Sequence, residues 1–128
     1  MSQFLLDTTV LIDFSHQREP VYARLAALLA GSDELAVSPV GVTELYAGLH
    51  PDRRRRWENF FATLTYWPIS LAAAQQAGIW RFDFARRSIT LSLPDSLVAA
   101  VAYEHGATVI TDNTRHFPMP ELTLLSLR

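Results

Sequence analysis

Four acidic residues stand at positions where a carboxylate needs a partner, and they are the first candidates for chemistry in this sequence. They are Asp7, Glu44, Asp95 and Asp112. An ionised carboxylate beside apolar residues is costly to bury, so such an acid is expected to be paired, solvated or bound to a metal. If the four side chains converge, their mutual repulsion requires cations nearby.

Each acid also has a purely structural interpretation. Asp95, which follows a proline, is suited to cap a helix or to favour the dipole of its first turn. Asp112 beside Asn113 is suited to a turn, and Glu44 to exposure in solvent. Asp7 is hardest to explain in this way, because it lies between the apolar run "FLL" and two threonines. Both interpretations stay open for the other three acids.

The chain offers no soft metal ligands around these acids. It has no cysteine, and its four histidines lack the spacing of a metal site. Carboxylate oxygens alone favour hard divalent ions, Mg²⁺ or Mn²⁺, over zinc. Such ions leave positions for water and phosphate oxygens, so the acids point to phosphodiester hydrolysis by activated water.

Short apolar runs alternate along the chain with segments of helical periodicity. Strands are expected at residues 4–7, 34–40, 108–111 and 122–127, a short strand or extended link at 65–70, and helices at 8–16, 20–30, 40–49, 52–64, 71–87 and 93–106. This alternation predicts an α/β sandwich around a mostly parallel sheet. Ligands bind such sheets at the carboxyl ends of the strands, where Asp7 and Asp112 are expected.

Composition limits the class of protein. With 128 residues, of which 49% are hydrophobic, the chain can form one well-packed core, so we expect a single domain over residues 1–128. The net charge of −2 gives no general attraction to nucleic acid, and any such binding must come from a local patch. The sequence lacks a signal peptide and any apolar stretch of about 20 residues, so we expect a cytoplasmic protein that does not enter a membrane.

Three motifs in order, "LLDTTVLID", "VTELYAG" and "LPDSLVAAVAYEHGATVITDNTRHF", resemble the PIN domain, and within it the toxin ribonucleases of VapBC-type toxin–antitoxin modules. The resemblance extends from the first strand to about Phe117. It implies a Rossmann-like three-layer sandwich and an endoribonuclease that depends on Mg²⁺ or Mn²⁺. It also implies an RNA substrate such as a tRNA or another structured RNA, a VapB-like antitoxin that holds the enzyme inactive, and a homodimer.

The resemblance also assigns roles to the acids. Asp7, Glu44 and Asp95 match the first three catalytic acids of the family, with Asp7 and Asp95 as metal ligands. Asp112 is the choice for the fourth acid. The neighbouring Asn113 stays open as the alternative, because relatives carry either residue type at this point.

Hydroxyl and basic residues complete the expected site. The resemblance gives Thr8 and Thr111 the task of orienting acids or water. Arg86 and Arg87 precede the "LPD" segment by a few residues and are expected to meet a substrate phosphate or an antitoxin carboxylate. The run "RRRR" at 53–56 cannot place more than two side chains on one helix face, so a solvated helix start is favoured over an RNA-binding patch.

Two further expectations concern partners and the alternative function. The helices at 20–30 and 40–49 are expected to form a groove for an amphipathic antitoxin helix. The rival to the enzyme is a non-catalytic PIN-like module that binds RNA or a protein without cutting. Retention of three clear acids favours the enzyme.

Overall fold

The computed structural model describes residues 2–128, and at its centre lies a five-stranded sheet. The strands are β1 (Gln3–Leu6), β2 (Glu34–Val37), β3 (Thr65–Tyr66), β4 (Thr108–Ile110) and β5 (Thr123–Leu125). They lie in the order β3-β2-β1-β4-β5, and every neighbouring pair is parallel. The sheet is therefore parallel throughout, as the alternation of strands and helices indicates.

Helices connect the strands, as expected from the sequence. They are α1 (Thr8–Ser15), α2 (Val21–Leu29), α3 (Pro39–Ala47), α4 (Arg54–Phe61), α5 (Leu71–Ala85) and α6 (Leu93–His105), with short 3₁₀ turns η1 (Pro51–Arg53) and η2 (Thr114–His116). The strand expected at 34–40 ends earlier, because Ser38 is the N-cap of α3 and Pro39 occupies its first turn. Within residues 2–128, no helix has the length and apolar character needed to cross a bilayer.

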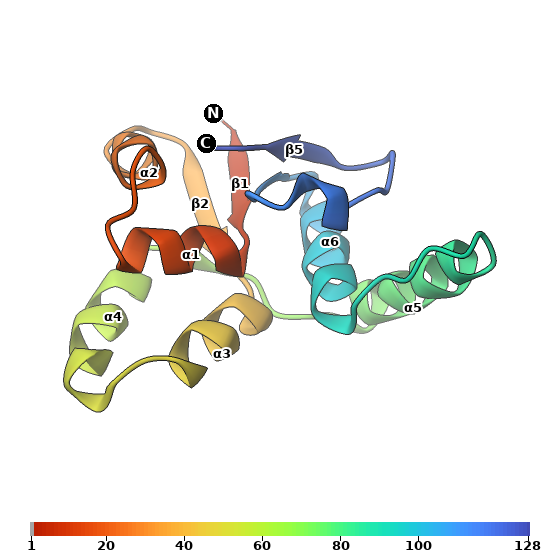
Figure 1. Cartoon of the computed structure of the whole chain (residues 1–128), viewed down its shortest axis with the longest axis horizontal. Coiled ribbons are helices and arrows are strands. Elements are labelled where there is room, and N and C mark those ends of the chain that lie inside the picture. Colours follow the sequence, from red (N-terminus) through yellow and green to blue (C-terminus); the bar gives the residue numbers. More distant parts are fainter. Residues whose placement is uncertain (1) are drawn as a thin grey trace.

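The two faces of the sheet bury different side chains, because successive residues of a strand point to opposite sides. Leu5, Ala36 and Val109 pack into the core under α5 and α6. On the opposite face, the core under α1, α2 and α4 contains Leu6 and Ile110. Figure 1 shows α1, α2 and α4 on one side of the strands and α5 and α6 on the other. The architecture is thus the predicted three-layer α/β sandwich.

Helix α3 lies between the two layers rather than within one. Its Leu45 belongs to the core under α1, while its Val40 packs against the core under α6. The helix can approach closely at Gly41, where a Cβ atom would lie 3.4 Å from Leu11 Cδ1 and 3.9 Å from the Thr8 hydroxyl oxygen. This approach brings Glu44 beside the start of α1.

Helix α6 begins with a side-chain cap that sets the place of Asp95. The Ser92 hydroxyl accepts a hydrogen bond from the Asp95 backbone N–H at 3.1 Å. At the other end, Gly106 adopts φ +63° and closes the helix in the left-handed conformation. Ser92 is therefore the cap, and Asp95 lies in the first turn with its carboxylate free for another role.

The chain leaves β1 in one direction toward β2 and later returns on its other side as β4. This reversal makes a topological switch point at the carboxyl ends of β1 and β4. Asp7 follows β1 directly, and its backbone N–H donates to the Ile110 carbonyl oxygen at 3.0 Å. The residues after both strands are thus held side by side.

Candidate active site

Asp7 is the central acid of this edge of the sheet. Asp7 is 5% exposed, and its Oδ2 accepts hydrogen bonds from the hydroxyls of Thr111 at 2.9 Å and Thr9 at 3.2 Å. Burial raises the pKa of Asp7 above its ordinary value, and the negative charge of Asp95 adds to the rise, although both hydroxyl bonds oppose it. The site therefore encloses a carboxylate that favours a nearby positive charge.

Glu44 has a hydroxyl partner from α1. The Thr8 hydroxyl donates to Glu44 Oε1 at 2.6 Å, while the glutamate as a whole is exposed on α3. Of the two predicted hydroxyls, Thr111 thus orients Asp7 and Thr8 orients Glu44. Sequence reasoning missed Thr9, which shares Asp7 with Thr111; its place in "DTT" was the only available signal.

Asp95 reaches the site from the first turn of α6. Its side chain is 24% exposed, and its Oδ2 lies 3.4 Å from Nδ1 of His116 in η2. Its charge contributes to the raised pKa of Asp7, which shows that the two carboxylates are electrostatic neighbours. His116, which sequence reasoning did not place in the site, thus contacts one of the predicted acids.

The side chain of Asp112 is enclosed, although the residue as a whole is only half-buried. Its side chain is 0% exposed, and neither carboxylate oxygen has a hydrogen-bond partner among residues 2–128. Burial raises its pKa to about 6, and the nearby charges of Asp13 and Asp7 contribute. The turn interpretation gains no support, because the bond that shapes this turn runs from the Asn113 backbone N–H to the Thr111 hydroxyl at 3.0 Å.

Asp13 and Arg128 join this group, and sequence reasoning did not include either. Asp13, on α1, is 6% exposed and accepts a hydrogen bond from Arg18 Nη1 at 3.0 Å. Burial alone would raise its pKa, but the hydrogen bond from Arg18 and the positive charges of Arg18 and Arg128 lower it. Arg128 Nε lies 3.5 Å from Asp112 Oδ2, and its Nη2 lies 3.8 Å from Asp13 Oδ2.

The chemistry of this edge fits a hard divalent cation. All the converging acids offer oxygen, and the enclosed Asp112 carboxylate has unsatisfied oxygens on both sides. As the side chains stand in residues 2–128, however, no three acidic or histidine groups are close enough to hold an ion together. Glu44, Asp95 and Asp112 instead face Thr8, His116 and Arg128. Metal binding would require these side chains to change partners.

Comparison with known proteins identifies the family. The PIN domain profile matches residues 4–121. The chain belongs to the PIN domain family. It is 29% identical to ribonuclease VapC19 of Mycobacterium tuberculosis over 92% of this chain and 95% of the relative. It is 34% identical to ribonuclease VapC10 of the same species over 91% of this chain and 87% of the relative.

A solved structure agrees with this placement among VapC-type PIN domains. The structure of DNA-bound VapBC from Salmonella typhimurium superposes with a TM-score of 0.82 at 25% identity, with all of both chains covered. The resemblance recognised from the motifs and the predicted fold class are therefore confirmed. These comparisons do not test the roles assigned to single residues.

A cavity of about 200 Å³ opens beside Asp95 in this PIN domain, between the loop before α6 and η2. The basic residues that line it are Arg115 and His116. Arg86 and Arg87 are predicted to meet a substrate phosphate or an antitoxin carboxylate. Their Cζ atoms lie 5.4 Å from the centre of the Phe82 ring and 4.2 Å from the centre of the Phe84 ring. Among residues 2–128, no ion pair joins either arginine to an acid. Both remain exposed at the start of the loop that forms the cavity wall.

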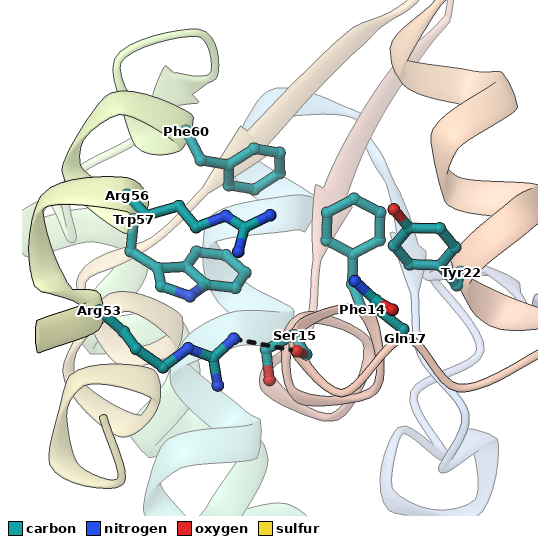
Figure 2. A pocket seen from close by; sticks show the side chains of 8 residues that line it. All are labelled: Phe14, Ser15, Gln17, Tyr22, Arg53, Arg56, Trp57 and Phe60. Atoms are coloured by element: carbon teal, nitrogen blue, oxygen red, sulfur yellow. Dashed lines mark hydrogen bonds between the residues drawn. The ribbon is translucent and has the colours of Figure 1, made fainter. Parts of the chain in front are cut away.

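A second cavity, of about 240 Å³, is lined by aromatic and arginine side chains and by none of the four acids. Figure 2 shows Phe14 and Tyr22 across the cavity from Arg53, Arg56, Trp57 and Phe60. Two of the four arginines of the "RRRR" run thus share one surface, which is the limit that helical geometry sets. The expected groove between α2 and α3 is wrong, because α1 packs against both of those helices and the cavity opens between α1, α2 and α4.

Asp112→Asn is expected to stabilise the fold at alkaline pH and to lose this effect in acid. The pKa of Asp112 in the folded protein is about 6, above its ordinary value of 3.8. Above about pH 6 the wild type therefore holds an unfavourable buried charge that asparagine removes. As the pH falls from about 6 toward the ordinary value of 3.8, the folded wild type takes up its proton, so the advantage of the variant shrinks and the two melting temperatures should converge only near about pH 4. At about pH 8 we expect thermal melting to show a gain of about 3 °C or more, equivalent to roughly 1 kcal/mol.

Asp83→Asn is the matched control for this measurement, because Asp83 is exposed on α5. Its melting temperature should follow that of the wild type at every pH. A gain for Asp112→Asn that persisted unchanged in acid would contradict the raised pKa.

Proposed function

We propose that the whole chain is one PIN domain that acts as the toxin ribonuclease of a VapBC-type toxin–antitoxin module. It hydrolyses RNA phosphodiester bonds with water and a divalent ion, Mg²⁺ or Mn²⁺. The observation that carries this proposal is that Asp7, Asp95 and Asp112 converge at the carboxyl edge of the sheet. Besides burial, the charge of Asp95 raises the pKa of Asp7, and the charge of Asp7 raises the pKa of Asp112. Similarity to the VapC ribonucleases supports the same activity.

In this proposal the acids divide the work. Asp7 and Asp95 hold the metal, and Glu44 and Asp112 complete the catalytic set, with Asp112 preferred over Asn113. A bound divalent ion supplies positive charge for the attacked phosphate and makes its bound water more acidic. Thr111 and Thr9 fix the Asp7 carboxylate through their hydroxyl bonds, and Thr8 fixes Glu44 in the same way.

RNA is proposed to approach along the cavity beside Asp95. Arg115 and His116 line that cavity, and Arg86 and Arg87 stand at the start of its loop, so all four can meet phosphates next to the cut bond. Their exposure suits a mobile, single-stranded segment of a structured RNA such as a tRNA. A substrate of this class places the protein in the cytoplasm.

Asp7→Asn should abolish cleavage of purified tRNA in Mn²⁺ or Mg²⁺ while the fold holds or gains stability, because asparagine keeps the size and removes a buried charge. We expect a loss beyond the roughly 10- to 100-fold typical of groups that only orient metal ligands. Gel analysis of cleavage and thermal melting of the same samples check this. Asp83→Asn, the same change on an exposed helix face, should cleave like the wild type.

The rival function gives a different result in that experiment. A non-catalytic PIN-like module would bind the tRNA equally with and without metal and would release no fragments. Wild-type protein that binds tRNA without cutting it in either metal, or cleavage that survives excess chelator, would contradict the proposed enzyme.

A VapB-like antitoxin is the proposed protein partner, and the second cavity is its proposed docking site. Four aromatic side chains accept apolar side chains there, while Arg53 and Arg56 suit an acidic neighbour. An amphipathic antitoxin segment with apolar and acidic side chains satisfies all of these groups.

Expression of the chain should stop bacterial growth, and co-expression of its antitoxin should restore growth. Arg56→Glu should keep the toxicity but weaken the rescue, because it reverses a charge at the cavity without touching the acids. Arg55→Glu, which does not line the cavity, serves as the control. Colony counts on plates that contain the inducer measure both the toxicity and its rescue by the antitoxin. Full rescue of Arg56→Glu would show that the antitoxin docks elsewhere.

The chain is also proposed to form a homodimer. One face of α5 exposes Leu71, Ile79 and Phe82 at 75%, 54% and 62%, and a dimer would remove this apolar surface from water. Light scattering at tens of micromolar, roughly where weak dimers form, should give twice the 14.4 kDa of one chain. Phe82→Arg should shift the mass toward the monomer. A monomeric wild type would refute the dimer.

A further inference from the structure

The segment after β5, residues 126–128, crosses the carboxyl edge of the sheet and brings an arginine to the acids. The backbone on the way is anchored at two points. The Thr111 N–H donates to the Leu125 carbonyl oxygen at 3.0 Å, and Arg24 Nη1 donates to the Leu127 carbonyl oxygen at 2.9 Å. Leu127 itself is 5% exposed and belongs to the core under α1 and α2. Arg128 is therefore presented to the site by an ordered backbone.

The guanidinium of Arg128 lies within ion-pair distance of two buried carboxylates without a hydrogen bond to either. Its Nε is 3.5 Å from Asp112 Oδ2 and its Nη2 is 3.8 Å from Asp13 Oδ2, while its side chain is 64% exposed. Asp13 has a closer partner in Arg18, at 3.0 Å. Asp112 has no other cation within ion-pair distance in residues 2–128. Arg128 is thus the counter-charge of Asp112, and it is held loosely enough to leave.

We propose that Arg128 occupies the place of a cation at Asp112 and competes with the divalent metal for that carboxylate. The inference rests on the proposed function in taking Asp7 and Asp95 as the metal ligands, and it adds Asp112 to them. The positive charge of a guanidinium within about 4 Å of a carboxylate repels a divalent ion that approaches the same carboxylate. The contact with Arg128 also keeps Asp112 engaged with a protein partner in this structure.

A different role for Arg128 would change metal affinity in the opposite direction. If Arg128 served to orient Asp112 for the metal, its removal would weaken metal binding, because the carboxylate would lose its fixed position. If Arg128 only stabilised the fold, its removal would lower the melting temperature without changing metal affinity. Competition alone predicts tighter binding after removal.

The test is a calorimetric titration of the full chain with Mn²⁺ in the absence of RNA. Arg128→Gln should bind Mn²⁺ about five-fold or more tightly than the wild type, in line with the usual size of coupling between two competing ligands. Arg128→Lys, which keeps the charge, should stay within about two-fold of the wild type, since lysine still acts as a point charge. Arg55→Gln, with the same change in net charge on α4 and no acid partner in the described part of the chain, should match the wild type.

A second readout guards against a folding artefact. The rise in melting temperature produced by saturating Mn²⁺ should be larger for Arg128→Gln than for the wild type, whatever their metal-free values. Unchanged or weaker Mn²⁺ binding by Arg128→Gln would overturn the proposal. If the wild type still cleaves tRNA in that case, only the competition fails. If Arg128→Gln binds Mn²⁺ more tightly but the wild type does not cleave tRNA, the competition is upheld and the proposed nuclease activity is rejected.

Discussion

The hydrogen bond from the Thr111 hydroxyl to Asp7 holds together the two ends of the chain that make the site. The two residues are 104 positions apart in sequence, yet they follow the neighbouring parallel strands β1 and β4. The backbone bond from Asp7 to Ile110 fixes the same junction. Because α1 begins at this junction, the positions of Thr8, Thr9 and Asp13 depend on it, and so does the contact of α1 with α3 that brings Glu44 near.

Burying ionised acids at this edge of the sheet costs folding free energy, and pairing offsets part of that cost. Asp7 and Asp112 both have raised pKa values because they are buried near other acids, so in their ionised form they destabilise the fold. Hydroxyl donors at Asp7 and Arg128 at Asp112 reduce that cost without removing it. A protein with no function at this edge would gain by replacing these acids with neutral residues, so the strain is best explained by a ligand that needs negative charge.

The fold was largely predictable because its signals are local. Apolar runs, helical periodicity, Gly106 and the prolines gave the order of strands and helices, and strand ends correctly placed Asp7 and Asp112 at one edge. Contacts between distant segments could not be predicted in this way. Nothing in the sequence links Arg128 to Asp112 or distinguishes Thr9 from Thr8, since both contacts depend on how the sheet closes. The prediction of a groove between α2 and α3 was wrong for the same reason, because sequence order does not reveal that α1 packs against both helices. The catalytic roles of the acids stay predictions.

The most direct test of this account is the position of a bound metal. Crystals soaked in Mn²⁺ and measured near the manganese absorption edge give an anomalous map in which only the ion stands out. The account predicts a peak between the carboxylates of Asp7 and Asp95, with the Arg128 guanidinium withdrawn from Asp112. A map without a peak at the carboxyl edge of the sheet at saturating Mn²⁺, or with its only peak elsewhere on the protein, would contradict it.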